Sequence, residues 1–313
     1  MNIDECVIRT LSYFDVFDYP LTFSEIKKYL CCELELTDDE LYDQIALVPV
    51  VQESDGYYHL LGRNKITQMR SERYEISVEK LARAKIISKI LSVVPTIDYI
   101  GISGSLSMNN ASVSDDIDLF FITKRNTLWI TRFLVNCILI IFGQKRKRKT
   151  QDAKDKICPN MFMEQGKLAF LPKQRTLYTA HEIVQLTGLV DRNSSYQQFI
   201  VKNKWIGSKL PNIIIEQSNL KKNSKYSSLL TRLATPFEKI AYLVQLRILK
   251  GNMTNEVVSK TRAAFHPIDR QKIIMDMYKL RSAHYTKLYI DNLWVDRDEA
   301  RFYMEEKKIR ILN

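Results

Sequence analysis

The chain opens with apolar residues that recur three and four positions apart. Within residues 3–17 these positions share one side of a helix, and Pro20, which cannot continue a helix, follows soon after. The apolar positions are Ile3, Val7, Leu11 and Phe14. This pattern predicts a first amphipathic helix that is stopped by Pro20.

Two further short helices are predicted from capping signals. Thr22 with Glu25, and Thr37 with Glu40, have the Ser/Thr-x-x-Glu spacing. In this spacing the side chain of each residue caps the backbone of the other, at the start of a helix. We therefore expect one helix to begin after Thr22 and another after Thr37.

A hairpin is predicted to follow the third helix. Residues 50–52 and 57–60 are largely apolar or aromatic, and the intervening residues 53–56 end in Asp-Gly, a strong hairpin signal. Three helices followed by a hairpin predict a winged-helix domain over residues 1–62.

Residues 63–94 contain neither glycine nor proline and are rich in lysine, arginine, glutamate and isoleucine. This composition favours a helical connector between the head and the next domain. The connector itself suggests no chemistry.

Two apolar strands separated by a glycine-containing turn are predicted after the connector. The expected order is a strand at 97–103, a turn at Gly104 and Ser105, a short helix at 106–111 and a second strand at 116–122. These elements begin a predicted core domain over residues 95–175.

The most apolar segment of the chain is 128–142. It is shorter than the roughly 20 residues that cross a bilayer, and it contains Arg132 and Asn136. We interpret it as a buried helix and expect no membrane span.

The rest of the core and the C-terminal part are predicted as follows. A strand at 157–164, a turn at 165–166 and a returning strand at 167–171 complete the core. Helices are expected at 176–189, 196–210, 236–249 and 269–285, with Pro236 at a first helical position, so residues 176–313 form a predicted helical domain.

Composition and cysteine usage limit the class of protein. The 313 residues are 45% apolar and 27% charged, which is typical of a folded globular protein. The five cysteines form no CxxC pair, so neither a disulfide framework nor a zinc cage is indicated, and we expect a cytoplasmic protein.

Charge is distributed unevenly along the chain. Residues 1–62 hold 3 basic and 13 acidic side chains, a balance of −10, whereas the remaining residues hold 44 basic and 23 acidic ones, a balance of +21. The predicted third helix of the head carries four acidic residues and no lysine or arginine. Because phosphate contacts supply most nonspecific DNA affinity, this helix opposes DNA binding and favours docking of a protein partner.

A run of five basic residues stands at 145–149, between the two predicted halves of the core. Such a run is commonly a solvated loop. Its functional interpretation is contact with phosphates of an NTP or of an acceptor such as RNA.

Asp116 and Asp118 carry the principal candidate chemistry. Because side chains alternate along a strand, the two carboxylates are expected on one face, while Ile117 and Leu119 lie on the other. Two like charges this close are unfavourable unless a cation neutralises them, and Mg²⁺ is commonly held by one or two carboxylates with phosphate oxygens. The pattern therefore predicts a Mg²⁺ site.

Gly104 and Ser105 supply a second candidate site just upstream. Glycine lets a phosphate approach the backbone closely, and the serine hydroxyl and the amides that follow it can donate hydrogen bonds. Gly-Ser, ten residues, and Asp-x-Asp on an apolar strand together resemble the signature of the polymerase-beta-like nucleotidyltransferase superfamily.

The resemblance covers about thirty residues and implies an α+β fold with a mixed-sheet nucleotidyltransferase core, flanked here by the winged helix and the helical C-terminal domain. It also implies that an NTP binds with Mg²⁺ and that a hydroxyl attacks its α-phosphate. Members usually have a third acidic residue on a later strand. Asn160 and Glu164 are the two candidates for that position. A neutral Asn160 would leave the site slow or limited to binding, whereas Glu164 would complete the set, unless it is a solvated hairpin end.

Three functional hypotheses follow. The first is Mg²⁺-dependent transfer of a nucleoside monophosphate to a hydroxyl acceptor, with Asp116 and Asp118 as catalytic metal ligands and Gly104 and Ser105 as the nucleotide-binding turn. The second is a catalytically degenerate core that binds nucleotide or RNA while the head recruits a protein. The third is a DNA-binding regulator built on the winged helix.

Overall fold

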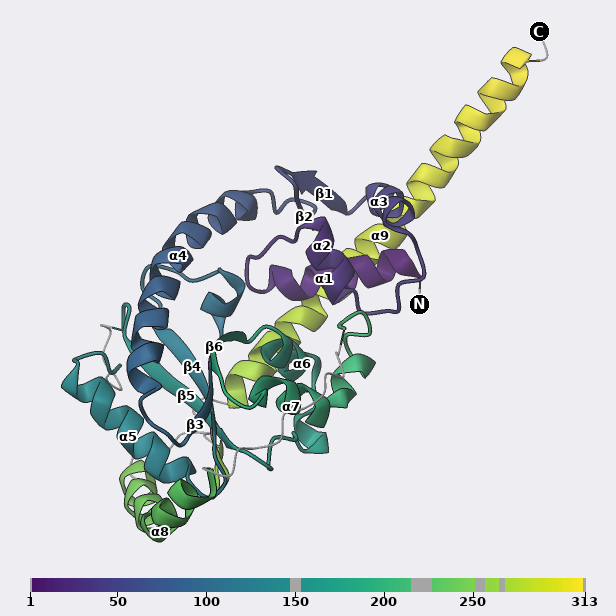
Figure 1. The fold of residues 1–313 in the computed structure, drawn as a ribbon. Coiled ribbons are helices and arrows are strands. Elements are labelled where there is room, and N and C mark those ends of the chain that lie inside the picture. Colours follow the sequence, from purple (N-terminus) through teal and green to yellow (C-terminus); the bar gives the residue numbers. More distant parts are fainter. Residues whose placement is uncertain (1, 147–152, 215–226, 251–256, 265–267, 312–313) are drawn as a thin grey trace. The chain divides into compact units, whose positions relative to one another are not determined.

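The computed structural model describes residues 2–146, 153–214, 227–250, 257–264 and 268–311 (Figure 1). The chain forms two compact units. Unit 1 comprises Met1–Arg70, Leu210–Ile213 and Ile273–Asn313, and unit 2 comprises Ser71–Lys209 and Ile214–Lys272. The limits of these units are not those of the four predicted segments.

Unit 1 begins with three helices, α1 (Ile3–Asp15), α2 (Phe23–Tyr29) and α3 (Asp38–Ala46). Thr22 and Glu25 form a complete capping box at α2, and Thr37 and Glu40 form another at α3. Both predicted helix starts are therefore confirmed.

The predicted hairpin of unit 1 is also confirmed. Strands β1 (Val51–Ser54) and β2 (Tyr57–Leu60) pair antiparallel, and Asp55 and Gly56 both have positive φ at the turn. Leu21 forms a further antiparallel bridge with Tyr58. A single residue before α2 thus extends the small sheet of the hairpin.

Unit 1 contains a disulfide that the sequence did not indicate. Cys6 of α1 is bonded to Cys32, which follows α2, at a sequence separation of 26. The expectation of no disulfide was wrong because it was based on CxxC spacing, whereas this pair is brought together by the packing of two helices.

Part of the last helix, α9 (Ile268–Ile311), belongs to unit 1. The Tyr289 hydroxyl donates to the Asp4 carboxylate, Arg281 pairs with Asp15, and the Tyr285 hydroxyl donates to the Leu61 carbonyl oxygen at 3.1 Å. The C-terminal helix therefore supplies partners to acidic groups of α1.

The described residues of unit 2 form a mixed sheet of six strands with helices on both faces, which confirms the α+β class. The strand order is β6-β3-β4-β5-β8-β7, and among the strands that the structure describes only β4 and β5 pair in parallel. The strands are β3 (Ile97–Ile102), β4 (Ile117–Thr123), β5 (Ile157–Glu164), β6 (Thr187–Asp191), β7 (Val257–Val258) and β8 (Arg262–Ala264).

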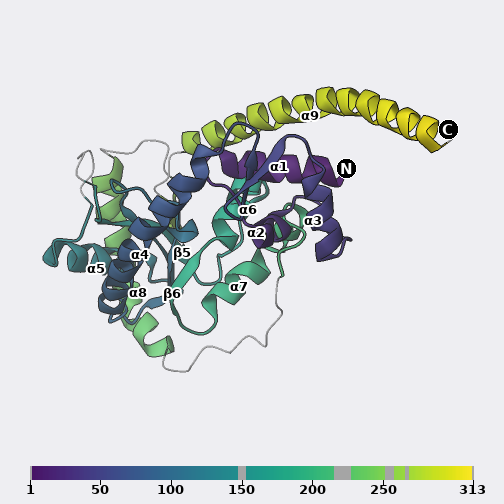
Figure 2. The same ribbon diagram turned by 90° about the horizontal axis from the view of Figure 1, so that it is seen from above.

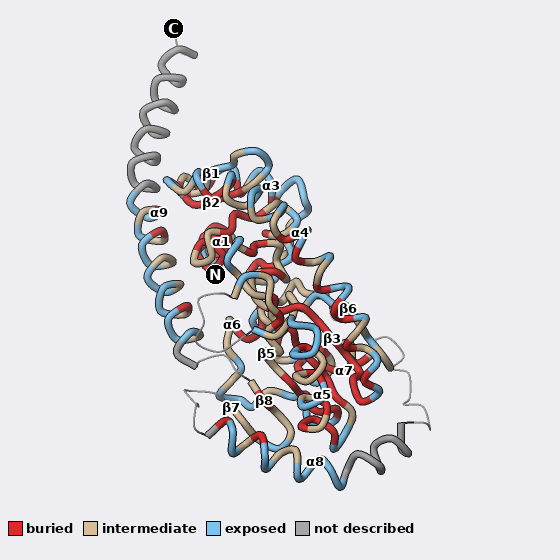
Figure 3. The backbone as a smooth tube through the Cα atoms, turned by 90° about the vertical axis from the view of Figure 1, so that its left-hand side faces the viewer, coloured by how far each residue is buried: buried red, intermediate tan, exposed pale blue. Residues whose placement is uncertain are grey.

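The two faces of the sheet are covered by different helices (Figures 1, 2 and 3). One face, which includes Leu119 and Phe121, is buried with residues of α4 (Lys65–Leu91), α5 (Leu128–Ile141) and α8 (Ser227–Lys250). On the other face Phe120 stacks on Phe199 of α7 (Ser195–Lys202). The alternation along β4 thus assigns its even-numbered positions, which include Asp118, to the face covered by α7.

The predicted connector is confirmed as α4, but several predictions further along were wrong. Residues 167–171 form no strand, because β5 pairs with β4 and β8 instead. Residues 187–191 form β6 rather than the end of a helix, and β7 and β8 also fall in the part predicted as helical. Pro236 lies inside α8 and not at its start.

Helix α5 is buried on one face only, whereas the sequence predicted a buried helix. Trp129 and Val135 are fully buried, but Phe133, Ile140 and Ile141 are largely exposed. In the described part of the chain, no helix combines the length and the apolar character required to cross a membrane.

Candidate functional site

The predicted glycine turn lies directly against the second predicted aspartate. The Ser103 amide donates to the Asp118 main-chain oxygen at 3.0 Å, which brings the end of β3 beside the start of β4. Gly104 follows with φ +70° and ψ −154°, and a Cβ at this position would lie 3.1 Å from Asp118 Oδ2. Only glycine adopts this conformation readily, and it leaves the carboxylate room beside the turn.

The two predicted aspartates lie close together with a cysteine. Asp118 is in β4 and Asp116 directly precedes that strand, and Cys158 of β5 pairs with Asp118 in register. One carboxylate oxygen from each aspartate and Cys158 Sγ all lie within 4.8 Å of one another, and all three residues are half-buried. The alternation of side chains that the sequence predicted therefore brings both carboxylates to one place.

Arg146 is a cation already present at this cluster. Its Nη1 lies 2.7 Å from Asp116 Oδ2. The backbone holds the arginine here because Arg146 N donates to the Ile157 carbonyl and Ile157 N donates to the Gln144 carbonyl. Within the basic run 145–149, Lys145 and Arg146 are described, and 147–149 lie outside the described residues.

The electrostatics of the cluster favour uptake of positive charge. Burial, together with the neighbouring charge of Asp116, raises the pKa of Asp118 to about 7. Burial likewise raises the pKa of the Cys158 thiol well above its usual range, with Asp118 and Asp116 acting in the same direction. A divalent cation would reverse these effects, because it stabilises the deprotonated form of every ligand.

Two charged residues outside the predicted site act on Asp118. Glu182, on α6 (Leu177–Val184), raises the pKa of Asp118, and Arg270, near the start of α9, lowers it. Burial raises the pKa of Glu182 itself, while Arg270 and the Tyr178 hydroxyl oppose that rise. The face of the sheet that carries Asp118 is thus bordered by a further carboxylate and a further guanidinium.

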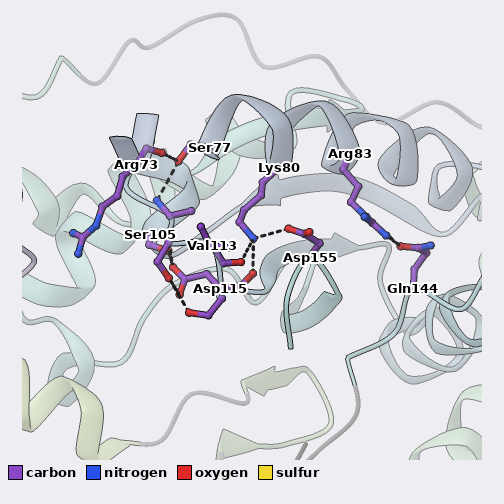
Figure 4. A network of polar contacts seen from close by, with 12 residues as sticks. Arg73, Ser77, Lys80, Arg83, Ser105, Val113, Asp115, Gln144 and Asp155 are labelled. Carbon is purple, nitrogen blue, oxygen red and sulfur yellow. Dashed lines mark hydrogen bonds and ion pairs between the residues drawn. The ribbon is translucent and has the colours of Figure 1, made fainter. Parts of the chain in front are cut away.

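The side chain of Ser105 is engaged within its own loop (Figure 4). Ser105 Oγ donates to Asp115 Oδ2 at 2.9 Å, and Ser112 donates to both oxygens of the same carboxylate. Although burial would raise it, these hydrogen bonds and the charge of Lys80 hold the pKa of Asp115 below its usual value. Asp115 is therefore an ionised anchor that closes the loop from Ser105 to Asp116.

Lys80 of α4 fixes the far end of that loop (Figure 4). Its side chain is 3% exposed, and Nζ donates to the Asp115 main-chain oxygen at 2.7 Å and to Asp155 Oδ1 at 2.6 Å. A third, longer bond of 3.3 Å reaches the Val113 oxygen. Because the Asp115 carbonyl belongs to the peptide group that precedes Asp116, Lys80 holds the backbone from which the Asp116 carboxylate projects.

Three more side chains on α4 support the site in the same manner (Figure 4). The Ser77 hydroxyl accepts from the Ala111 amide at 3.1 Å, and Arg73 donates to Asn110 Oδ1, also at 3.1 Å. Arg83 donates to Gln144 Oε1 at 2.7 Å, two residues before Arg146. One polar face of a helix predicted only as a connector thus positions both the aspartate loop and the arginine.

Neither of the two candidates for a third acidic position is the β5 residue that pairs with Asp118. Glu164 lies six residues beyond Cys158 along β5, about 20 Å away in an extended strand, and is paired with Thr123. It is 7% exposed, so it is not a solvated hairpin end. Asn160 is buried at an irregularity of the β4–β5 pairing. Cys158 is the β5 residue directly beside Asp118.

Cys158, Arg146 and Glu182 were not assigned to the site from the sequence. Cys158 comes two residues before the considered Asn160, so only the pairing register of β4 and β5 identifies it. Arg146 was noted only as part of a basic run. The signal that could have found it is the sequence position of that run, shortly before the strand that carries Cys158.

Comparison of the chain with protein-family models, with curated proteins and with solved structures gives no match.

Proposed function

We propose that this site binds an NTP together with Mg²⁺ and transfers the nucleoside monophosphate to a hydroxyl acceptor. The observation that carries the proposal is the close approach of the Gly104 turn to the Asp118 carboxylate: a Cβ added at Gly104 would lie 3.1 Å from Asp118 Oδ2. A phosphate-binding turn and a carboxylate pair are useful together only if one ligand spans both. A metal-bound triphosphate is such a ligand.

The two carboxylates of the cluster suit Mg²⁺. Asp116 and Asp118 would hold the ion, because it prefers hard oxygen ligands and usually takes one or two carboxylates with phosphate oxygens. When bound, the ion would neutralise charge on the triphosphate and on the leaving pyrophosphate. The nucleotide and water would fill the remaining coordination positions of the ion, because the protein offers few oxygen ligands.

The other residues have separate roles in this proposal. Gly104 leaves the backbone open to close approach by the triphosphate, and the first amides of the turn η1 (Ser105–Met108) can donate to it, whereas the Ser107 amide already donates to the Gly104 carbonyl oxygen. Since the Ser105 hydroxyl is bonded to Asp115, its amide is the group of Ser105 available to a phosphate. Arg146, 43% exposed, can exchange Asp116 for a phosphate oxygen when the ion takes the carboxylate.

A second candidate function is a catalytically degenerate core that binds nucleotide or RNA. It is favoured by the thiol of Cys158 in place of a third carboxylate and by the guanidinium of Arg146 on Asp116. In this case the acidic head would recruit a protein partner, and the basic run 145–149 would contact the RNA. Binding without turnover is the property that separates the two functions.

The test is thermal unfolding with and without NTP and Mg²⁺, combined with an assay for pyrophosphate release. We expect NTP with Mg²⁺ to raise the melting temperature of the wild type, and Asp118→Asn to abolish that increase. Glu79→Gln, an exposed carboxylate on α4, is the matched control and should respond as the wild type does. Equal ligand-induced shifts in wild type and Asp118→Asn would contradict both functions, whereas a shift without pyrophosphate release favours the second.

A further inference from the structure

The three side chains that converge at the start of β4 differ in chemical softness. Asp116 and Asp118 offer carboxylate oxygens, and Cys158 offers sulfur, all within 4.8 Å of one another. Mg²⁺ binds sulfur ligands weakly, whereas Zn²⁺ and Co²⁺ bind both carboxylate and thiolate. The cysteine is therefore the residue that distinguishes between classes of ion at this site.

The positions of these residues follow from strand pairing. Asp118 of β4 pairs with Cys158 of β5. The β3–β4 register ends at Ile102 and Leu119, and the Ser103 amide, which donates to the Asp118 main-chain oxygen, continues it by one residue. Residues directly opposite one another in adjacent strands point to the same face of a sheet. Ser103, Asp118 and Cys158 thus form a row across three strands, with their side chains on one face.

The buried hydroxyl of Ser103 independently indicates a ligand-binding site on this face. It is 7% exposed, and in the part of the chain that the structure describes its Oγ has no hydrogen-bond partner. A buried hydroxyl without a hydrogen-bond partner is unfavourable, because it has lost its bonds to water. Because it points to the same side as the Asp118 carboxylate, a group held by that carboxylate is positioned to satisfy it.

We propose that Asp116, Asp118 and Cys158 bind a thiophilic divalent ion of the Zn²⁺ class in the absence of nucleotide, with Ser103 bonded to its fourth ligand. Three protein ligands and one exchangeable water or anion are the usual set of an open zinc site. Tetrahedral ligands at about 2.0–2.3 Å from the metal lie roughly 3.5 Å apart, so the distances within a ligand cluster of 4.8 Å need to shorten by no more than roughly 1.3 Å.

Ion binding changes two bonds at the site. The Cys158 S–H bond is replaced by a sulfur–metal bond, and the proton leaves to solvent. The ion and the Arg146 guanidinium compete for the Asp116 carboxylate, on which Arg146 already holds one oxygen. Arg146→Ala should consequently tighten ion binding. This inference rests on the placement of the ligands and not on nucleotidyl transfer.

The test is titration of the full chain with Co²⁺, without nucleotide, followed by competition with Zn²⁺. A thiolate ligand gives cobalt a sulfur charge-transfer absorption, which Zn²⁺ should remove and Mg²⁺ should not. We expect the absorption in the wild type, its loss in Cys158→Ser, and a Zn²⁺ affinity that is about tenfold weaker in Ser103→Ala. Cys137→Ser and Cys31→Ser are matched controls at the other free cysteines and should retain the absorption.

Two results would overturn the inference. One is a wild type that shows no such absorption at saturating Co²⁺, and the other is a Cys158→Ser variant that keeps it. Each variant's melting temperature without metal shows that it is folded. If Cys158→Ser also retains the stabilisation by NTP with Mg²⁺, the proposed nucleotide site stands whatever the cobalt result. Conversely, cobalt binding can survive the loss of any NTP response.

Discussion

Replacing Gly104 with alanine tests the close approach on which the site depends. At φ +70° and ψ −154° the backbone lies in a region that is essentially restricted to glycine, where another residue costs about 1–3 kcal/mol. The added Cβ would also stand 3.1 Å from Asp118 Oδ2, so the carboxylate must move by a few tenths of an ångström. We expect Gly104→Ala to lower the free energy of unfolding by about 2–3 kcal/mol and to abolish stabilisation by NTP with Mg²⁺.

Gly143→Ala separates backbone strain from the carboxylate contact. Gly143 also belongs to unit 2 and has φ +62°, but a Cβ there would meet nothing within 4 Å. Urea unfolding should show a loss of about 1–2 kcal/mol for this variant, with the nucleotide response intact. If Gly104→Ala and Gly143→Ala match in both stability and nucleotide response, the contact between the turn and Asp118 has no functional role.

Two further predictions concern the support of the site and its sheet. Lys80→Met should lower the free energy of unfolding, measured in urea, by about 2–3 kcal/mol. The lysine side chain is 3% exposed, and its loss would leave Asp155 and two carbonyl groups without their hydrogen-bond donor. A loss below about 0.5 kcal/mol would refute this role. Burial raises the pKa of Asp98 from 3.8 to about 6, so the folded state holds its proton more tightly than the unfolded state does. The contribution of Asp98 to the free energy of unfolding should therefore fall by roughly 3 kcal/mol as the pH rises from about 4 to about 6. Asp98→Asn should lack this part of the fall and should be more stable than the wild type at pH 8. Parallel pH–stability curves for wild type and variant would contradict that assignment.

Signals that lie within a few residues of one another were sufficient to predict local structure. The capping pairs that start at Thr22 and Thr37 and the Asp55–Gly56 turn act through neighbouring backbone atoms, so their outcome does not depend on the rest of the fold. The alternation of Asp116 and Asp118 is local in the same sense.

Features that depend on pairing between residues far apart in the sequence could not be predicted from the sequence. Cys158 is beside Asp118 only because β5 pairs in parallel with β4 at one particular register, and no pattern within either strand fixes that register. The strand at Thr187–Asp191 is short and mostly exposed or half-buried, so it lacks the apolar signal of a core strand. The family resemblance remains a prediction, since no comparison supports or opposes it.

The anchoring of the 110–115 loop by α4 limits how its length can change. The contacts follow the same order in both segments: Arg73 bonds to Asn110, Ser77 to Ala111 and Lys80 to Asp115. Inserting or deleting one residue would shift every later loop atom by about 3.3–3.6 Å, more than a hydrogen bond can stretch. Sequence variation in this loop should therefore take the form of substitutions at a constant number of residues.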